Sequence, residues 1–159
     1  MIKHPLSPII CKESRVLILG SFPSVISRKE EFYYANPNNR FWKVLEILFE
    51  EEIKNREEFI CKHHLALWDV IASCDIEGSS DASICNVLPN PILELLQNYP
   101  IELIVLNGKT AEKLFKKYFP KCEVETITCP STSSANARCH LDDLVKAYYR
   151  IKVVNDEKN

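Results

Sequence analysis

The residues best suited to chemistry in this chain of 159 residues lie in one short stretch, between Gly20 and Trp42. A tight loop opens the stretch, and its backbone amides can point outward from the strand before it: Gly20, Ser21, Phe22, Pro23 and Ser24. A cluster of aromatic rings and amides follows: Phe32, Tyr33, Tyr34, Asn36, Asn38, Asn39, Phe41 and Trp42. Flat rings that can sandwich a base, beside amides that can read its edge or hold a water, are what a pocket for an extruded nucleobase requires.

The strand before this loop decides where such a pocket would lie. Residues 15–19 end in an unbroken aliphatic run, which is the composition of a strand buried on both faces of a parallel sheet. Ligands of open parallel sheets bind at the carboxyl ends of the strands. The loop that begins at Gly20 is therefore at the expected position for a binding site.

The remaining elements alternate between strands and helices. We expect strands at 65–69, 101–106 and 123–128, and helices at about 37–50, at 56–64, from 92, at 109–119 and from 141 onward. The pattern predicts an α/β fold: a three-layer α/β/α sandwich with a central four-stranded parallel sheet. Residues 1–14 resemble a polar arm, residues 70–90 a mixed, loop-rich region and residues 155–159 a frayed end. We expect one domain over residues 1–159.

The start of the helix at 37–50 bears directly on the chemistry. Asn36 can cap this helix, and Pro37 is acceptable at its first position because no amide hydrogen is needed there. Asn39 is then expected in the first turn, near the loop that follows Gly20.

Composition and chain ends limit the cellular setting. The chain is 46% hydrophobic and 26% charged, which fits one globular domain with a substantial core. No apolar run approaches the ~20 residues of a membrane span, and the first residues lack the apolar stretch of a signal peptide. We expect a monomer without membrane contact, in the cytoplasm or, if the source has a nucleus, in the nucleus.

The seven cysteines suggest neither a disulfide framework nor an iron–sulfur site, because their number is odd and no C-x-x-C pair occurs. Cys61 with His63 and His64, or Cys139 with His140, match no zinc signature. We therefore expect free thiols and no bound metal.

The net charge of −2 argues mildly against a nucleic-acid partner, since such proteins are commonly basic. A protein that visits DNA transiently needs only a local basic patch. The basic residues that could form one are Arg40, Lys43, Lys109, Lys113, Lys116, Lys117 and Arg138.

Five sequence blocks together carry a family resemblance. They are G-S-F-P-S at 20–24, Y-Y-A-N-P-N-N-R-F-W at 33–42, L-W-D-V-I-A-S-C at 67–74, N-G at 107–108 and S-T-S-S-A-N-A at 131–137. In this order, over most of the chain, they resemble the hypoxanthine-DNA glycosylase branch of the uracil-DNA glycosylase superfamily. The resemblance implies the uracil-DNA glycosylase fold and a monofunctional DNA glycosylase without a cofactor. Such an enzyme hydrolyses the N-glycosidic bond of a deaminated base, hypoxanthine in deoxyinosine, and leaves an abasic site.

The resemblance also implies that Asn39 is the catalytic amide. In the mismatch-specific branch the first loop reads G-I-N-P-G and its asparagine positions the attacking water, but this chain has Phe22 there. Cleavage builds positive charge on the sugar and negative charge on the base, so positioning of the water matters more than acid or base strength. The amides of the first loop can stabilise the anionic base. The competing interpretation of Asn39 is a helix-start residue that bonds its own backbone.

Other site residues follow from the same comparison and also leave alternatives open. Tyr34 occupies the position where related enzymes place a ring over the base, and a core tyrosine is the alternative. Asn107 resembles an asparagine that reads the base edge, against a simple Asn-Gly turn. Asp69 is expected to be structural, and Trp42 and Trp68 are expected in the core.

The last block resembles the loop that presses into the minor groove and fills the gap left by the extruded nucleotide. Its residues are Ser131, Thr132, Ser133, Ser134, Ala135, Asn136 and Arg138. Small hydroxyl residues suit close approach to phosphates, and Arg138 can enter the base stack. Family members usually have proline where this chain has Ser134, so the loop is expected to be less stiff.

Two other functions stay open on the sequence alone. One is a uracil or thymine mismatch glycosylase of the same fold, which the loss of the first-loop amide at Phe22 disfavours. The other is a non-catalytic nucleic-acid-binding module. A nucleotide-binding protein is poorly supported, because the Gly20 loop has neither a G-x-G-x-x-G pattern nor a Walker lysine.

Overall fold

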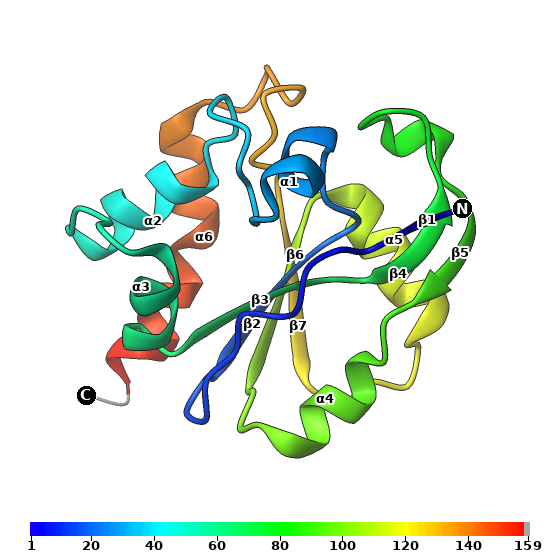
Figure 1. Ribbon diagram of the computed structural model, residues 1–159. Coiled ribbons are helices and arrows are strands. Elements are labelled where there is room, and N and C mark those ends of the chain that lie inside the picture. Colours follow the sequence, from blue (N-terminus) through cyan, green and yellow to red (C-terminus); the bar gives the residue numbers. More distant parts are fainter. Residues whose placement is uncertain (158–159) are drawn as a thin grey trace.

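The computed structural model describes residues 1–157 and has a four-stranded parallel sheet at its centre (Figure 1). The strands are β2 (Val16–Gly20), β3 (Leu65–Asp69), β6 (Leu103–Asn107) and β7 (Glu125–Cys129), in the order β3-β2-β6-β7. Each neighbouring pair is parallel. The predicted α/β class and its four-stranded parallel sheet are confirmed.

Helices cover both faces of this sheet (Figure 1). One layer holds α2 (Phe41–Phe49), α3 (Arg56–Lys62) and α6 (Leu141–Asp156), and the other holds α4 (Ile92–Asn98) and α5 (Lys109–Tyr118). Because both faces are covered, β2 and β3 are buried along their whole lengths, which accounts for their apolar composition. No helix among residues 1–157 is long and apolar enough to cross a membrane.

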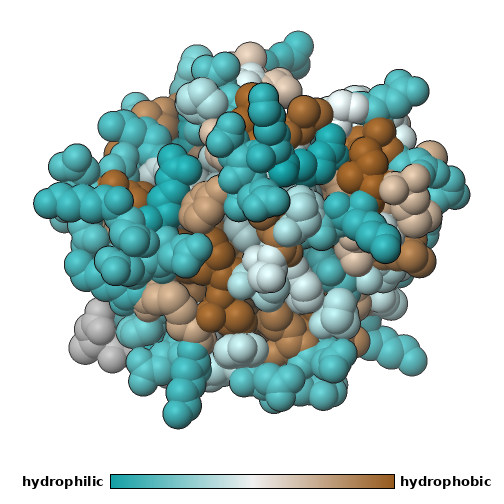
Figure 2. All heavy atoms as spheres, viewed as in Figure 1, coloured by the Kyte–Doolittle hydropathy of each residue, from teal (hydrophilic) through white to brown (hydrophobic). Residues whose placement is uncertain are grey.

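Most large apolar side chains are buried between these layers. Trp42 and Trp68 are 7% and 9% exposed and pack in the main core, as predicted. Figure 2 shows that hydrophilic residues cover most of the viewed face, with smaller hydrophobic areas between them.

The helix predicted at 37–50 begins later, at Phe41. The Asn36 side-chain oxygen accepts from the Asn38 amide at 2.9 Å, and the Asn36 carbonyl accepts from the Asn39 amide at 2.9 Å. These bonds close a turn in place of a first helical turn, as asparagine side chains commonly do. Asn39 therefore precedes the helix. A short unpredicted helix, α1 (Val25–Glu30), lies before this turn.

A second sheet was not predicted. β1 (Ile2–Lys3), β4 (Ile71–Asp75) and β5 (Cys85–Pro89) form an antiparallel sheet in the order β1-β4-β5. The polar arm expected at residues 1–14 and the mixed, loop-rich region expected at 70–90 thus contain strands that were not predicted. The signal was weak because β4 follows β3 after a single residue, β5 is largely exposed, and register shifts interrupt their pairing.

The N-terminal arm, residues 1–14, continues from β1 along the edge of β3. Ile9 and Leu67 exchange backbone hydrogen bonds of 3.0 and 2.8 Å. Cys11 is joined to Cys61 of α3 by a disulfide, with the two Cα atoms 5.7 Å apart. The expectation of free thiols is therefore wrong for this pair. A separation of 50 residues carries no local pattern that could reveal it. The free cysteines are Cys74, Cys85, Cys122, Cys129 and Cys139.

Candidate active site

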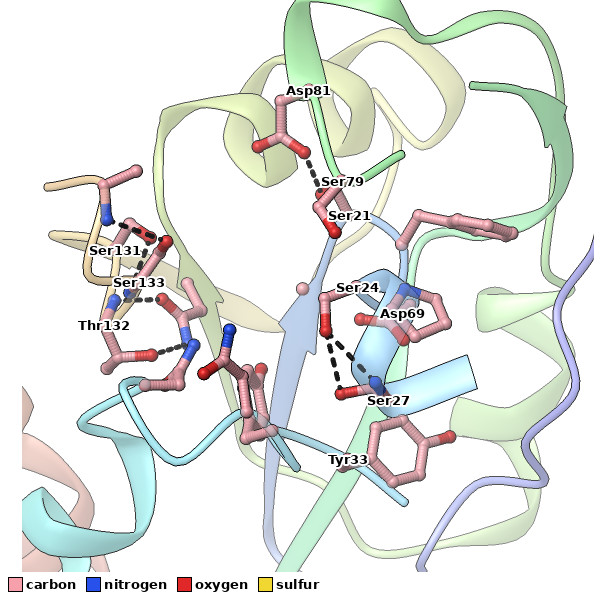
Figure 3. Close-up of a pocket in the computed structure, with 18 of the residues that line it drawn as sticks. Ser21, Ser24, Ser27, Tyr33, Asp69, Ser79, Asp81, Ser131, Thr132 and Ser133 are labelled. Atoms are coloured by element: carbon pink, nitrogen blue, oxygen red, sulfur yellow. Dashed lines mark hydrogen bonds between the residues drawn. The ribbon is translucent and has the colours of Figure 1, made fainter. Parts of the chain in front are cut away.

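A cavity of about 330 Å³ opens where the parallel strands end (Figure 3). Its volume lies in the range of pockets that hold small ligands, roughly 300–1,000 Å³. The predicted residues that line it are Gly20, Ser21, Phe22, Pro23, Ser24, Tyr34, Asn39, Asn107, Ser131, Thr132, Ser133, Ser134 and Ala135. The structure therefore brings the first loop, Asn39, Tyr34 and most of the last block together. Asn136 and Arg138 do not line the cavity.

The first loop is fixed by its carbonyl groups. The carbonyls of Gly20 and Ser21 accept from the amides of Val70 and Ile71 at 2.9 and 3.1 Å, so the loop is bonded to the junction of β3 and β4. Gly20 is required because a Cβ there would lie 2.5 Å from the Asp69 side-chain oxygen Oδ1.

The amides of the same loop are left free. Within residues 1–157, the backbone N–H groups of Ser21, Phe22 and Ser24 donate to no protein acceptor. Pro23 has no N–H. All three residues line the cavity, where such donors can bind the negative charge of a departing group.

Asn39 lines the cavity from the segment before α2. Its side-chain oxygen accepts from the Phe41 amide at 2.9 Å, which fixes the oxygen and nitrogen ends of the carboxamide. The nitrogen donates to no described residue, and one lone pair of the oxygen remains unused. Asn39 thus bonds its own backbone and still presents hydrogen-bonding groups for a ligand.

Tyr34 has a left-handed backbone with φ of 53°, which is uncommon for a residue with a large side chain. Its ring stacks on Phe41 with centroids 4.0 Å apart. Its hydroxyl is buried without a well-formed hydrogen bond, 3.3 Å from where a Cβ on Gly20 would lie. Burial, and then the nearby Asp69 carboxylate, raise the pKa of Tyr34, and the adjacent Asn107 amide opposes the rise. Tyr34 is thus both core and cavity wall.

Asn107 lines the cavity, and each end of its carboxamide already makes one hydrogen bond. Its nitrogen donates to the Thr132 hydroxyl at 3.1 Å, and its oxygen accepts from the Thr132 amide at 3.1 Å. The pair of bonds fastens the end of β6 to the last block. Gly108 follows with φ of 102°, and a Cβ there would lie 3.1 Å from the Ser131 side chain.

Arg40 holds the last block in shape. Its guanidinium donates to the carbonyls of Cys139, Ser133 and Asn136, the latter two at 3.1 and 3.2 Å. Its backbone amide donates to the Thr132 carbonyl at 3.0 Å. Arg40 is thus not a free surface cation, because its guanidinium is directed at these carbonyls; the basic patch of which it was expected to be part stays a prediction. Sequence reasoning missed this role, since nothing links position 40 to positions 132–139 before folding.

Further hydrogen bonds inside the last block also hold its backbone in shape. The Asn136 side chain donates to the Ser131 carbonyl at 3.0 Å, and the Ser133 and Ala135 amides donate to the hydroxyls of Ser131 and Ser133. Figure 3 shows part of this network around Ser131, Thr132 and Ser133. The block is thus ordered without a proline at 134.

Two carboxylates in the cavity were not predicted there. Asp69 is 4% exposed and lines the cavity, where its oxygen Oδ2 lies 2.7 Å from Nε2 of His4. Asp81 accepts from the Ser21 hydroxyl at 3.3 Å, as Figure 3 shows, and burial raises the pKa of Asp81. No group of three or more metal-binding side chains occurs within residues 1–157.

The sequence and fold match those of known proteins. The profile of the Uracil DNA glycosylase superfamily matches residues 7–151. Proteins named Hypoxanthine DNA glycosylase from Methanosarcina barkeri and Methanosarcina acetivorans are 31% and 32% identical over 144 and 149 residues, each match covering 87% of this chain and 90% of the relative. The solution structure of a candidate uracil DNA glycosylase from Methanosarcina acetivorans superposes with a TM-score of 0.77 at 26% identity, covering 92% of this chain and 96% of that one.

Proposed function

This chain belongs to the uracil DNA glycosylase superfamily, and we propose that it is a DNA glycosylase that excises hypoxanthine from DNA containing deoxyinosine. It hydrolyses the N-glycosidic bond and leaves an abasic site. The observation that carries the proposal is the cavity itself, which is lined both by Asn39, whose carboxamide keeps unused hydrogen-bonding groups, and by the first loop with its free backbone amides. The two relatives named for hypoxanthine support the choice of base.

Asn39 is the residue we assign to the attacking water. Its oxygen keeps one lone pair beside the bond from Phe41, so it can accept a hydrogen from water and direct the water oxygen at the sugar carbon C1′. The bond from Phe41 holds the carboxamide in place before the substrate arrives, and such pre-positioning lowers the barrier without a strong base.

The departing base is stabilised by the first loop. As the glycosidic bond breaks, the bonding electron pair moves onto the base, and the free N–H groups of Ser21, Phe22 and Ser24 can donate to the resulting anion. Tyr34 supplies a ring wall for the extruded base, for which stacking contributes ~1–3 kcal/mol.

DNA engagement is assigned to the last block, residues 131–138. Its hydroxyl residues line the cavity, and Arg138 is exposed and lies outside the lining. Arg138 can contact phosphate or enter the stack of an opened duplex. We infer a single domain that acts as a monomer without a cofactor, in the compartment that holds the DNA.

A panel of duplexes, each with one lesion, tests the function. We expect alkali-labile sites to form fastest at hypoxanthine, measured as single-turnover rates and compared with the rates at uracil, xanthine and mismatched thymine. Faster excision of uracil or thymine would replace the proposal by the mismatch activity. DNA binding without excision of any lesion would replace it by the non-catalytic module.

A further inference from the structure

Asp69 lines the cavity and is paired with the buried side chain of His4 behind it, and the mechanism above uses neither residue. Asp69 ends β3, and its Oδ2 atom lies 2.7 Å from Nε2 of His4 in the N-terminal arm. The two side chains are only 5% and 4% exposed. The second oxygen, Oδ1, accepts from no described residue, and Asp69 lines the cavity (Figure 3). The cavity lining therefore offers one unused carboxylate oxygen.

We propose that His4 is a positioning residue that holds the Asp69 carboxylate so that Oδ1 accepts the ring N–H of the extruded base. This inference rests on the proposed function and adds a basis for its selectivity. Hypoxanthine carries a hydrogen on N1, whereas adenine presents a bare acceptor at the same atom. A carboxylate oxygen would attract the first and repel the second, because an ionised carboxylate can only accept. The pair would thus separate a deaminated base from its parent.

The surroundings of His4 keep its Nε2 hydrogen directed at Asp69. The other ring nitrogen, Nδ1, lies 2.9 Å from the Leu6 carbonyl and 3.1 Å from the Leu6 amide. A charged ring can donate from Nδ1 to the carbonyl, and a neutral ring can accept there from the amide. In both states Nε2 carries a hydrogen. Leu6 therefore allows His4 to remain a donor to Asp69 whether or not the ring is charged.

The arm that carries His4 is fixed to the fold at several points. The His4 amide donates to the Ala72 carbonyl at 2.7 Å, next to the pairing of β1 with β4. The Tyr33 hydroxyl, from the wall of the cavity, donates to the Ser7 carbonyl at 2.9 Å. The rings of Phe22 and Tyr33 lie 5.8 and 6.1 Å from that of His4. The arm thus packs behind three residues that line the cavity, Phe22, Tyr33 and Asp69.

The experiment compares two substrates that differ in one hydrogen-bond donor. Duplexes carry either hypoxanthine or its 1-deaza analogue, in which a C–H replaces the N1–H, and single-turnover excision rates are measured for each. We expect the native protein to favour hypoxanthine by about 10- to 100-fold, the effect of a hydrogen bond to a charged group. We expect Asp69→Ala to reduce this ratio to about one.

His4 variants then test positioning against simple structural support. We expect His4→Ala to reduce the ratio at least severalfold and His4→Gln, which keeps an N–H donor, to restore part of it. Lys3→Ala, an exposed neighbour on β1, is the matched control and should leave the ratio unchanged. Asp69→Asn keeps the shape of the side chain and removes its charge, so a similar fall of the ratio in this variant excludes misfolding as the cause.

The outcomes separate this inference from the proposed function. Equal loss on both substrates in His4→Ala, or no change on either, would overturn the positioning role while excision itself stands. A native protein that excises hypoxanthine and its analogue at equal rates would also overturn it. Failure of the native protein to excise hypoxanthine at all would overturn the proposed function instead.

Discussion

Two asparagines face the same cavity and differ in what their amides do. Asn39 uses one lone pair for the Phe41 amide and leaves the rest of its carboxamide free, whereas Asn107 has both ends bonded to Thr132. The segments around them differ in the same way. Residues 33–39 leave polar groups available, and residues 131–139 bond mainly to one another and to Arg40. A residue's place in the cavity lining therefore does not determine its role. The hydrogen bonds that the side chain already makes within the protein decide which of its groups can still bind a ligand.

The largest effect that tests this contrast between the two asparagines is expected for Asn39→Ala. We expect single-turnover excision to fall by at least ~100-fold, because loss of a pre-positioned catalytic group commonly costs that much. Asn36→Ala is the matched control, since Asn36 also lines the cavity and bonds a backbone amide two residues on. An Asn39→Ala protein that retains full activity would remove Asn39 from the mechanism and break the contrast.

A second effect, of intermediate size, is expected for Arg40→Ala. The carbonyls of Ser133, Asn136 and Cys139 lose their donor, so we expect DNA affinity to weaken by ~10-fold as the last block loosens. Arg40→Lys should rescue little, because an ammonium cannot reproduce the fork of donors. The measurement is affinity as a function of salt. We expect the slope of log affinity against log salt to be the same in Arg40→Ala and in the native protein. If Arg40 instead neutralised a phosphate, the slope of the variant would be smaller by about 1.

Asn107 and Thr132 form a pair that a double-mutant cycle can resolve. We expect Asn107→Ala and Thr132→Ala each to lower the free energy of unfolding by ~1–2 kcal/mol, and the double variant to lose less than the sum. Urea unfolding measures this. Hypoxanthine excision should fall in both single variants, and less in Thr132→Ala, whose backbone amide still bonds Asn107. A loss of excision in Asn107→Ala without a loss of stability would show that Asn107 reads the base after all.

The smallest effect is expected for Ser134→Pro. The Ser134 amide donates to no described residue, so proline removes no hydrogen bond there, and the block is already held by Arg40. We expect stability to change by less than about 1 kcal/mol and excision to stay within twofold of the native rate. A large gain in DNA affinity would mean that the native block is loose, contrary to its bonding.

The sequence predicted the parts of this molecule that depend on local pattern. Buried aliphatic runs indicated β2, β3 and β6, and the conjunction of a tight loop with Asn39 and Tyr34 indicated the cavity that the structure contains. Each of these signals lies within a few residues of chain. Periodicity and turn chemistry are sufficient for such signals.

The residues that escaped prediction act across long separations. Arg40 binds carbonyls more than 90 residues away, and His4 meets Asp69 across 65 residues. Neither contact leaves a local pattern, because each depends on how completed elements pack. The start of α2 was misplaced for the opposite reason: the Asn36 turn competes locally with the helix, and propensity alone did not decide between them.

The bridge between Ile9 and Leu67 has a consequence for how copies of the protein behave in solution. β3 is the outermost strand of the central sheet, and a bare outer strand presents unpaired backbone groups on which another chain can add. The arm pairs with this outer edge of β3 and so hinders its pairing with another chain. Deleting residues 1–14 should therefore yield a protein whose copies polymerise by pairing their outer strands. The polymers would be detected as an increase in light scattering over time.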